Sequence, residues 1–129
     1  MNKKLRICHI GWAHSIHIEK LMKWFTNKEY DISIITDNPT EIDGVKIYVI
    51  PKSFDVDAKT RWERYKRLSF NIYILQKIRH QFLRVLWIRN IVKEINPDII
   101  HAHSLWYPGY LGVYINGYPF VVTVLNGDV

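Results

Sequence analysis

The chain has 129 residues, the length of one domain, and its hydrophobic share of 48% is enough to build a packed core and excludes intrinsic disorder. One cysteine, Cys8, excludes an internal disulfide and a cysteine-based zinc module, and it favours a reducing, cytoplasmic compartment. The net charge is +6, yet residues 59–95 alone hold ten Lys or Arg against two Glu, so the basic character belongs to one segment.

The first half of the chain alternates short apolar runs with turn residues. Leu5–Ile10 is typical of a buried parallel strand. Ser15 is placed to cap a helix over about residues 16–27, where apolar side chains recur on one face. Two further apolar runs, each closed by a turn residue or a proline, predict strands at Asp31–Thr36 and Val45–Ile50.

From about residue 60 to residue 95 the apolar positions lie three or four apart, which indicates helix. The pattern predicts two helices, or one helix with a break near Ser69–Ile74, where β-branched and aromatic residues crowd together. Asn96 and Pro97 should stop the helix. Two strands and a short helix complete the prediction: Asp98–Ala102, Pro119–Val124 and Leu105–Ile115.

The alternation of strands and helices predicts an α/β fold, a Rossmann-like, doubly wound parallel sheet with three layers, α/β/α. Residues 1–129 are interpreted as a single domain of this kind. In such sheets ligands bind at the carboxyl ends of the strands, where the winding reverses, and we expect that point between the first and fourth strands. Because such a domain usually closes with a helix over its last strand, we expect a longer polypeptide or one half of a split enzyme.

Three loops, after the first, fourth and fifth strands, should converge on this edge of the sheet. Histidines there suit proton transfer or oxyanion stabilisation. Loop N–H groups and the start of a helix suit a phosphate. The candidate residues, loop by loop, are Gly11, Trp12, His14, Ser15 and His17; His103, Ser104, Trp106 and Tyr107; and Asn126, Gly127 and Asp128.

Some of these positions have a simpler interpretation. His9 lies within the first strand and is interpreted as a core residue. His101 alternates with His103 on the fourth strand, so we expect at most one of the two to face the site directly. Trp12 and Trp106 either pack the domain or stack on a sugar or a base.

A zinc site is the sharper chemical alternative. His14 and His17 stand three residues apart, and His103 should end the adjacent strand, so these imidazoles with Asp128 could hold zinc with an open position. The chain would then be a metal-dependent, hydrolase-like domain. No HExxH motif supports this alternative, and we expect no metal.

The basic segment 59–95 admits three interpretations. Charges on an amphipathic helix most often form a solvated face. Ten cations interleaved with aromatic residues also suit a helix pair that lies on an anionic membrane surface, which would make the protein peripheral to the inner face of a membrane. Nucleic acid would accept the same face, although we expect no nucleic-acid partner.

Several stretches of the chain resemble a known family. Pro97–His103 (PDIIHAH) and Pro119–Val124 (PFVVTV) are similar to the N-terminal domains of family 4 glycosyltransferases, which have the two-domain GT-B fold. The opening is similar as well, with Ser15–His17 before a helix that contains Lys23–Trp24, followed by Tyr30–Thr36. The resemblance covers nearly the whole chain.

The resemblance implies the acceptor side of a retaining glycosyltransferase of cell envelope polysaccharide biosynthesis, inactive alone. A second domain, outside residues 1–129, would bind a nucleotide sugar, and the acceptor would be a lipid-linked molecule, a glycan or a small molecule. No metal or other cofactor is implied. His17 and His103 fall on family histidines and are the implied catalytic residues. The expected substrate-binding residues are Gly11, Trp12, His14, Ser15, Ser104, Trp106, Asn126 and Asp128.

Overall fold

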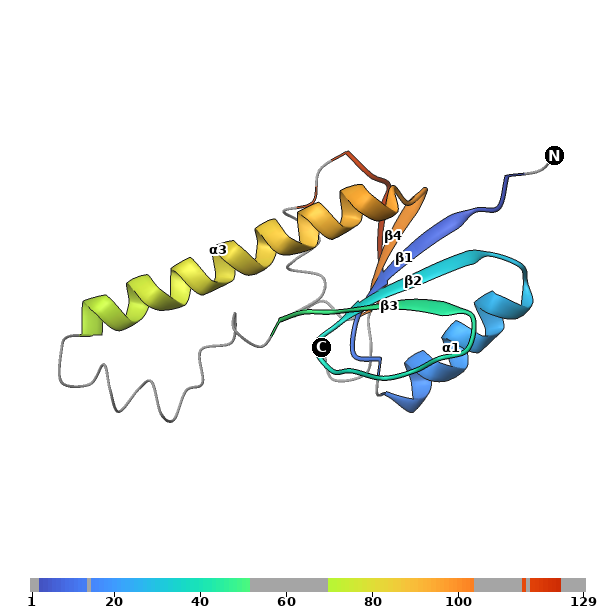
Figure 1. Ribbon diagram of the computed structural model, residues 1–129, viewed down its shortest axis with the longest axis horizontal. Coiled ribbons are helices and arrows are strands. Elements are labelled where there is room, and N and C mark those ends of the chain that lie inside the picture. The colour runs from blue at the N-terminus through green and yellow to red at the C-terminus, as the bar shows by residue number, and fades with distance from the viewer. Residues whose placement is uncertain (1–2, 14, 52–69, 104–114, 116, 124–129) are drawn as a thin grey trace.

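The computed structural model describes residues 3–13, 15–51, 70–103, 115 and 117–123 (Figure 1). Within these ranges five strands and two helices are present. In chain order they are β1 (Arg6–Ile10), α1 (Ile16–Asn27), β2 (Asp31–Thr36), β3 (Val45–Val49), α3 (Phe70–Ile95), β4 (Ile99–His103) and β5 (Phe120–Thr123).

The five strands form one parallel sheet in the order β3-β2-β1-β4-β5. Strand β1 pairs with β2 on one side and with β4 on the other, so that Cys8 of β1 lies opposite both Ser33 of β2 and Ile100 of β4. The pairing of β1 with β4 joins segments far apart in the chain. The winding therefore reverses between β1 and β4. This arrangement confirms the predicted fold class and the predicted position of the switch point.

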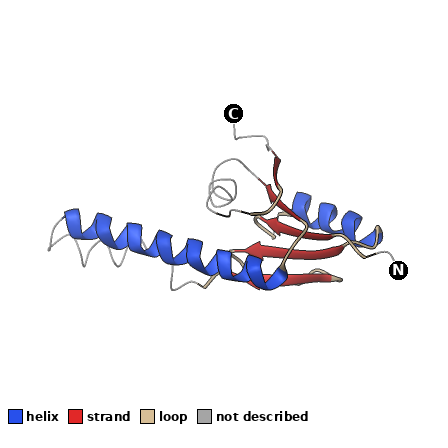
Figure 2. Ribbon diagram, turned by 90° about the horizontal axis from the view of Figure 1, so that it is seen from above, coloured by secondary structure: helices blue, strands red, loops and turns tan. Residues whose placement is uncertain are grey.

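Alternation along the strands divides the core into two layers, one on each face of the sheet. On one face Ile7 and Ile34 pack against Ile18 and Met22 of α1. On the other face, Cys8, Ile10, Ile35 and Ile100 pack with side chains of α3 and with Ile115. Figures 1 and 2 show the two helices on opposite sides of the sheet. The α/β/α layering is therefore a direct result of the period of two within each strand.

Helix α3 runs without a break from Phe70 to Ile95. The predicted break near Ser69–Ile74 is therefore absent from residue 70 onward, and the earlier residues of the basic segment lie outside the described ranges. Asn96 ends the helix with a φ of 48°, a left-handed conformation that Asn tolerates, and its N–H donates to the carbonyl of Val92 at 2.8 Å. Pro97 follows, and the predicted stop is confirmed.

Only the carboxyl-terminal half of α3 packs against the sheet. Ile88 and Val92 are buried there, whereas Leu75, Ile78 and Phe82 are 65%, 59% and 61% exposed. Figures 1 and 2 show the reason, since the amino-terminal half of α3 extends past the edge of the sheet. No helix in the described ranges is both long and apolar enough to cross a membrane.

Most of the predicted boundaries agree with the structure to within one or two residues. Ser15 holds the N-cap position of α1, although its side chain makes no capping hydrogen bond. The helix predicted at 105–115 lies outside the described residues except for Ile115, whose buried side chain joins the core on the α3 face.

Candidate functional site

The end of β1 and the end of β4 meet at a glycine. A Cβ placed on Gly11 would lie 3.1 Å from Cδ1 of Ile18 and 3.3 Å from Cβ of His103. These contacts are tight, so a larger residue at position 11 would push α1 and β4 apart. Gly11 therefore allows the first loop, the start of α1 and the last residue of β4 to lie together.

A buried threonine at the end of β2 holds the first loop in place. The hydroxyl of Thr36 accepts a hydrogen bond from the backbone N–H of Ala13 at 3.1 Å, and the Gly11 N–H donates to the carbonyl of Ile35 at 3.1 Å. A small hollow opens beside this loop at the carboxyl ends of β1, β2 and β3, and it is lined in part by Trp12 and Asp37. Thr36 is not among the site residues predicted from the sequence.

The structure places some of the predicted site residues and is silent on others. Gly11 and His103 are buried side by side, Trp12 and Ser15 are partly exposed, and His17 is exposed in the first turn of α1. The remaining candidates, from all three loops, lie outside the described residues: His14, Ser104, Trp106, Tyr107, Asn126, Gly127 and Asp128. The predicted convergence of the third loop therefore stays a prediction.

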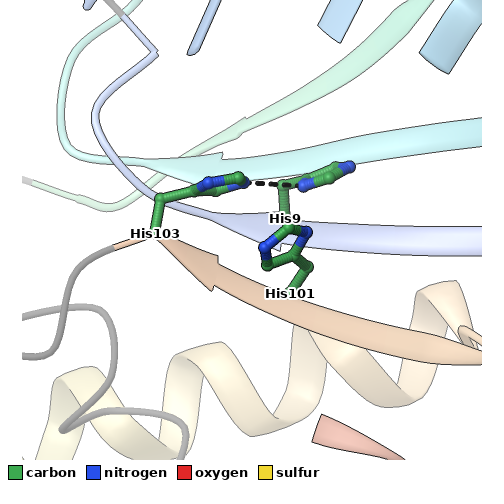
Figure 3. A group of neighbouring side chains, drawn as sticks. All are labelled: His9, His101 and His103. Atoms are coloured by element: carbon green, nitrogen blue, oxygen red, sulfur yellow. Dashed lines mark hydrogen bonds between the residues drawn. The ribbon is translucent and has the colours of Figure 1, made fainter. Parts of the chain in front are cut away.

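The most distinctive polar feature is a cluster of three histidines, which we call the histidine cluster: His9 from β1 and His101 and His103 from β4 (Figure 3). The parallel register sets His9 opposite His101, and His103 lies one repeat further along β4. Nδ1 of His9 and Nε2 of His103 form a hydrogen bond of 2.8 Å. The ring centroids of His101 and His103 are 4.2 Å apart.

The cluster corrects the premise of one sequence-based expectation and confirms another expectation. His101 and His103 do not point to opposite faces, because residues i and i+2 of a strand share a face, and both side chains lie on the face that α1 covers. That at most one of them faces the site stays a prediction. His9 is a core residue, as expected, with 0% exposure and its ring against Phe25 of α1 at 5.1 Å. The membership of His9 in a polar cluster was not predicted from the sequence.

Burial keeps the cluster neutral near pH 7. Desolvation, and then the proximity of His103 and His101, lowers the pKa of His9 to about 2. Desolvation followed by the proximity of His101 lowers the pKa of His103 to about 4, and desolvation also lowers the pKa of His101. The neutral rings present lone pairs that can accept a proton, a hydrogen bond or a metal ion.

Cys8 offers no nucleophile at this site. It lies on the opposite face of β1 and is fully buried in the α3 core. Burial raises the pKa of its thiol to about 12, so the thiolate is scarce at neutral pH. Among the residues that the structure describes, the β1–β4 junction offers imidazoles, backbone amides and hydroxyls.

Comparison with known proteins gives the family. No curated protein matches the chain. A family model described as glycosyl transferase 4-like matches residues 6–129, which is nearly the entire sequence and includes all seven described elements of the fold. The parallel sheet, the switch point between β1 and β4 and this match agree with the resemblance drawn from the sequence motifs. The chain is thus a glycosyltransferase domain and belongs to the glycosyl transferase 4-like family.

Proposed function

We propose that this domain is the acceptor side of a retaining, two-domain GT-B glycosyltransferase. It would receive a sugar from a nucleotide sugar, which a second domain outside residues 1–129 binds, and pass it to a lipid-linked, glycan or small-molecule acceptor. The family match over residues 6–129 carries the proposal. The switch point supports it, because ligands of doubly wound sheets bind where the winding reverses.

In this proposal His17 and His103 orient or polarise the acceptor hydroxyl. His17 is exposed at the start of α1, where a ligand can reach it. The lowered pKa of His103, about 4, makes its imidazole neutral and able to accept a hydrogen bond near pH 7. Trp12 and Ser15 lie on the connecting loop, and Gly11 lets the backbone come close. The nucleotide sugar is a substrate, and the proposed transfer uses no cofactor.

Titration of the chain with acceptor mimics tests the binding role. We expect saturable binding of glycan or lipid-linked acceptors, weakened about tenfold in His17→Ala, since one hydrogen bond to a charged or polar ligand contributes about 1.5 kcal/mol. The matched control is Lys20→Ala, a second exposed residue near the start of α1, and it should bind as the wild type does. Calorimetry measures the affinities.

Activity should appear only when a donor-binding domain is supplied with the chain. The product should then keep the anomeric configuration of the donor sugar, which proton NMR of the anomeric centre reports. Tighter binding of nucleotide sugars than of any acceptor would contradict an acceptor-side role. Equal affinities for the acceptor in His17→Ala, Lys20→Ala and the wild type would show that His17 does not bind the acceptor.

We also propose that α3 holds the domain against an anionic membrane. Leu75, Ile78 and Phe82 follow a spacing of three and four and form an exposed apolar stripe on the amino-terminal half of α3. This half of the helix extends past the sheet (Figure 2). The exposed cations on the same helix are Lys77, Arg79, Arg89 and Lys93. An apolar stripe with neighbouring cations is the pattern of helices that bind at the headgroup level of anionic bilayers.

Sedimentation with vesicles tests the membrane proposal. The chain should pellet with phosphatidylglycerol vesicles and much less with phosphatidylcholine vesicles. Phe82→Ser should weaken this binding roughly tenfold or more, because burial of a Phe side chain is worth about 1.5–3 kcal/mol. Lys20→Ala, an exposed cation on α1, serves as the control. Equally poor binding to both vesicles, unchanged in Phe82→Ser, would refute the proposal.

A further inference from the structure

The histidine cluster brings three potential metal ligands to one point. One ring nitrogen from each of His9, His101 and His103 lies within 4.8 Å of the others (Figure 3). The three residues stand on β1 and β4, two neighbouring strands at the centre of the sheet, so their backbone positions are fixed by the sheet ladder. A site on such rigid elements needs only side-chain adjustment to receive an ion.

The cluster is incompletely satisfied by protein groups. Nδ1 of His9 and Nε2 of His103 share one hydrogen bond, and His101 is hydrogen-bonded to Thr123. Nε2 of His9 is buried and has no hydrogen-bond partner among the described residues. An ion in place of the proton shared by Nδ1 of His9 and Nε2 of His103 would exchange that one hydrogen bond for coordination by three imidazoles.

We propose that His9, His101 and His103 form a binding site for a divalent transition metal ion, with Zn²⁺ as the best-fitting ion. This site differs from the set His14, His17, His103 and Asp128 that the sequence suggested. It shares His103 with the proposed acceptor role, so the two proposals are separated through His17 and His101, each of which belongs to only one of them. Neutral imidazoles favour Zn²⁺ and its neighbours over Mg²⁺ or Ca²⁺, which prefer oxygen ligands.

The geometry requires a small adjustment. Two nitrogens bound to tetrahedral zinc at about 2.0–2.1 Å lie about 3.4 Å apart. The His9 and His103 nitrogens, now 2.8 Å apart in a hydrogen bond, must separate by about half an ångström as the metal replaces the shared proton. His101 must approach them by rotation of its side chain.

An ion can reach the cluster from the β5 side. His9 and His103 are buried, but His101 is only partly buried, and Val121, its partner on β5, is 49% exposed. Three histidines leave one tetrahedral position for water or another small ligand on this side.

Calorimetric titration of the full chain, freed of metal and of any affinity-tag histidines, tests the proposal at pH 7.5. We expect one Zn²⁺ per chain with a dissociation constant of about 1 µM or below, and no binding of Mg²⁺. His101→Asn keeps a hydrogen-bond donor for Thr123 but is a poor zinc ligand, and it should weaken binding at least 100-fold. His17→Ala, on the exposed start of α1, should bind zinc as the wild type does.

The visible absorption of bound Co²⁺ tests the metal site in the wild-type protein without any substitution. Co²⁺ substituted for Zn²⁺ should show the visible absorption of a four-coordinate site with nitrogen ligands, and Zn²⁺ should displace it. Absence of saturable binding, wild-type affinity in His101→Asn, or lost zinc binding in His17→Ala would each overturn the proposal. His17→Ala should weaken acceptor binding about tenfold while its zinc affinity stays that of the wild type, so failure of one proposal can be distinguished from failure of the other.

Discussion

Acidification from pH 6.5 to pH 4.5 should lower the free energy of unfolding of the metal-free protein by about 4 kcal/mol, a large part of the roughly 5–15 kcal/mol that stabilises a small domain. The pKa values of His9 and His103 fall from the ordinary 6.5 to about 2 and about 4 on folding. Below pH 6.5 these two histidines bind protons in the unfolded chain but stay neutral in the folded chain. Stability is therefore complete above pH 6.5 and declines until the pH reaches the folded pKa values.

Urea unfolding at a series of pH values, with a chelator present, measures this slope. His9→Leu removes the His9 imidazole, whose lowered pKa accounts for about half of the expected loss, and should reduce that loss to about 2 kcal/mol over the same range. The control is Ile34→Val, beside His9 in the sheet register, which should lower stability by about 1 kcal/mol at every pH. A flat profile in the wild type, or an unchanged slope in His9→Leu, would contradict the account of the histidine cluster.

Ile88→Ala should lower the free energy of unfolding by about 2–5 kcal/mol, the usual range for truncating a buried Ile. Ile88 is 1% exposed and belongs to the core between α3 and the sheet, with Cys8, Ile10 and Ile100. Its loss leaves a cavity that the central strands cannot fill, because they are held on both sides by neighbouring strands. Chemical denaturation at pH 7.5 gives the value.

The same helix supplies the matched control. Ile78→Ala removes the same atoms at a position that is 59% exposed, and its effect on stability should stay within about 0.5 kcal/mol. Similar losses in the two variants would mean that α3 does not pack on the sheet through its carboxyl-terminal half. Ile78 also lies in the apolar stripe proposed for membrane binding. Ile78→Ala should therefore weaken binding to anionic vesicles while it leaves the free energy of unfolding almost unchanged.

Local patterns were enough to predict the elements. The strands Asp31–Thr36 and Val45–Val49 and the end of α3 at Asn96 follow from apolar runs, turn residues and proline, all of which act within a few residues. The break predicted near Ser69–Ile74 was wrong from residue 70 onward, where α3 is continuous. The reason is that β-branched and aromatic residues disfavour helix only weakly. The switch point was also predictable, because element order limits how a parallel sheet can be wound.

The histidine cluster shows what local patterns leave out. The spacing of two between His101 and His103 was a usable signal that they share a face, and it was misinterpreted. The contribution of His9 had no local signal, since it depends on how β1 pairs with a strand about ninety residues later in the chain. Thr36 was missed for the same reason, because its partner Ala13 lies on another loop.

By itself the sequence determined the order of the described strands and helices, the fold class, the position of the switch point and the resemblance to a glycosyltransferase family. The tertiary structure alone decided which side chains meet: the register between β1 and β4 brings His9 to His103, and the packing of α3 buries Ile88 while it leaves Ile78 exposed. The division has a physical cause. Backbone propensities and apolar periodicity act between neighbours in the chain, whereas register and packing arise from contacts between distant segments.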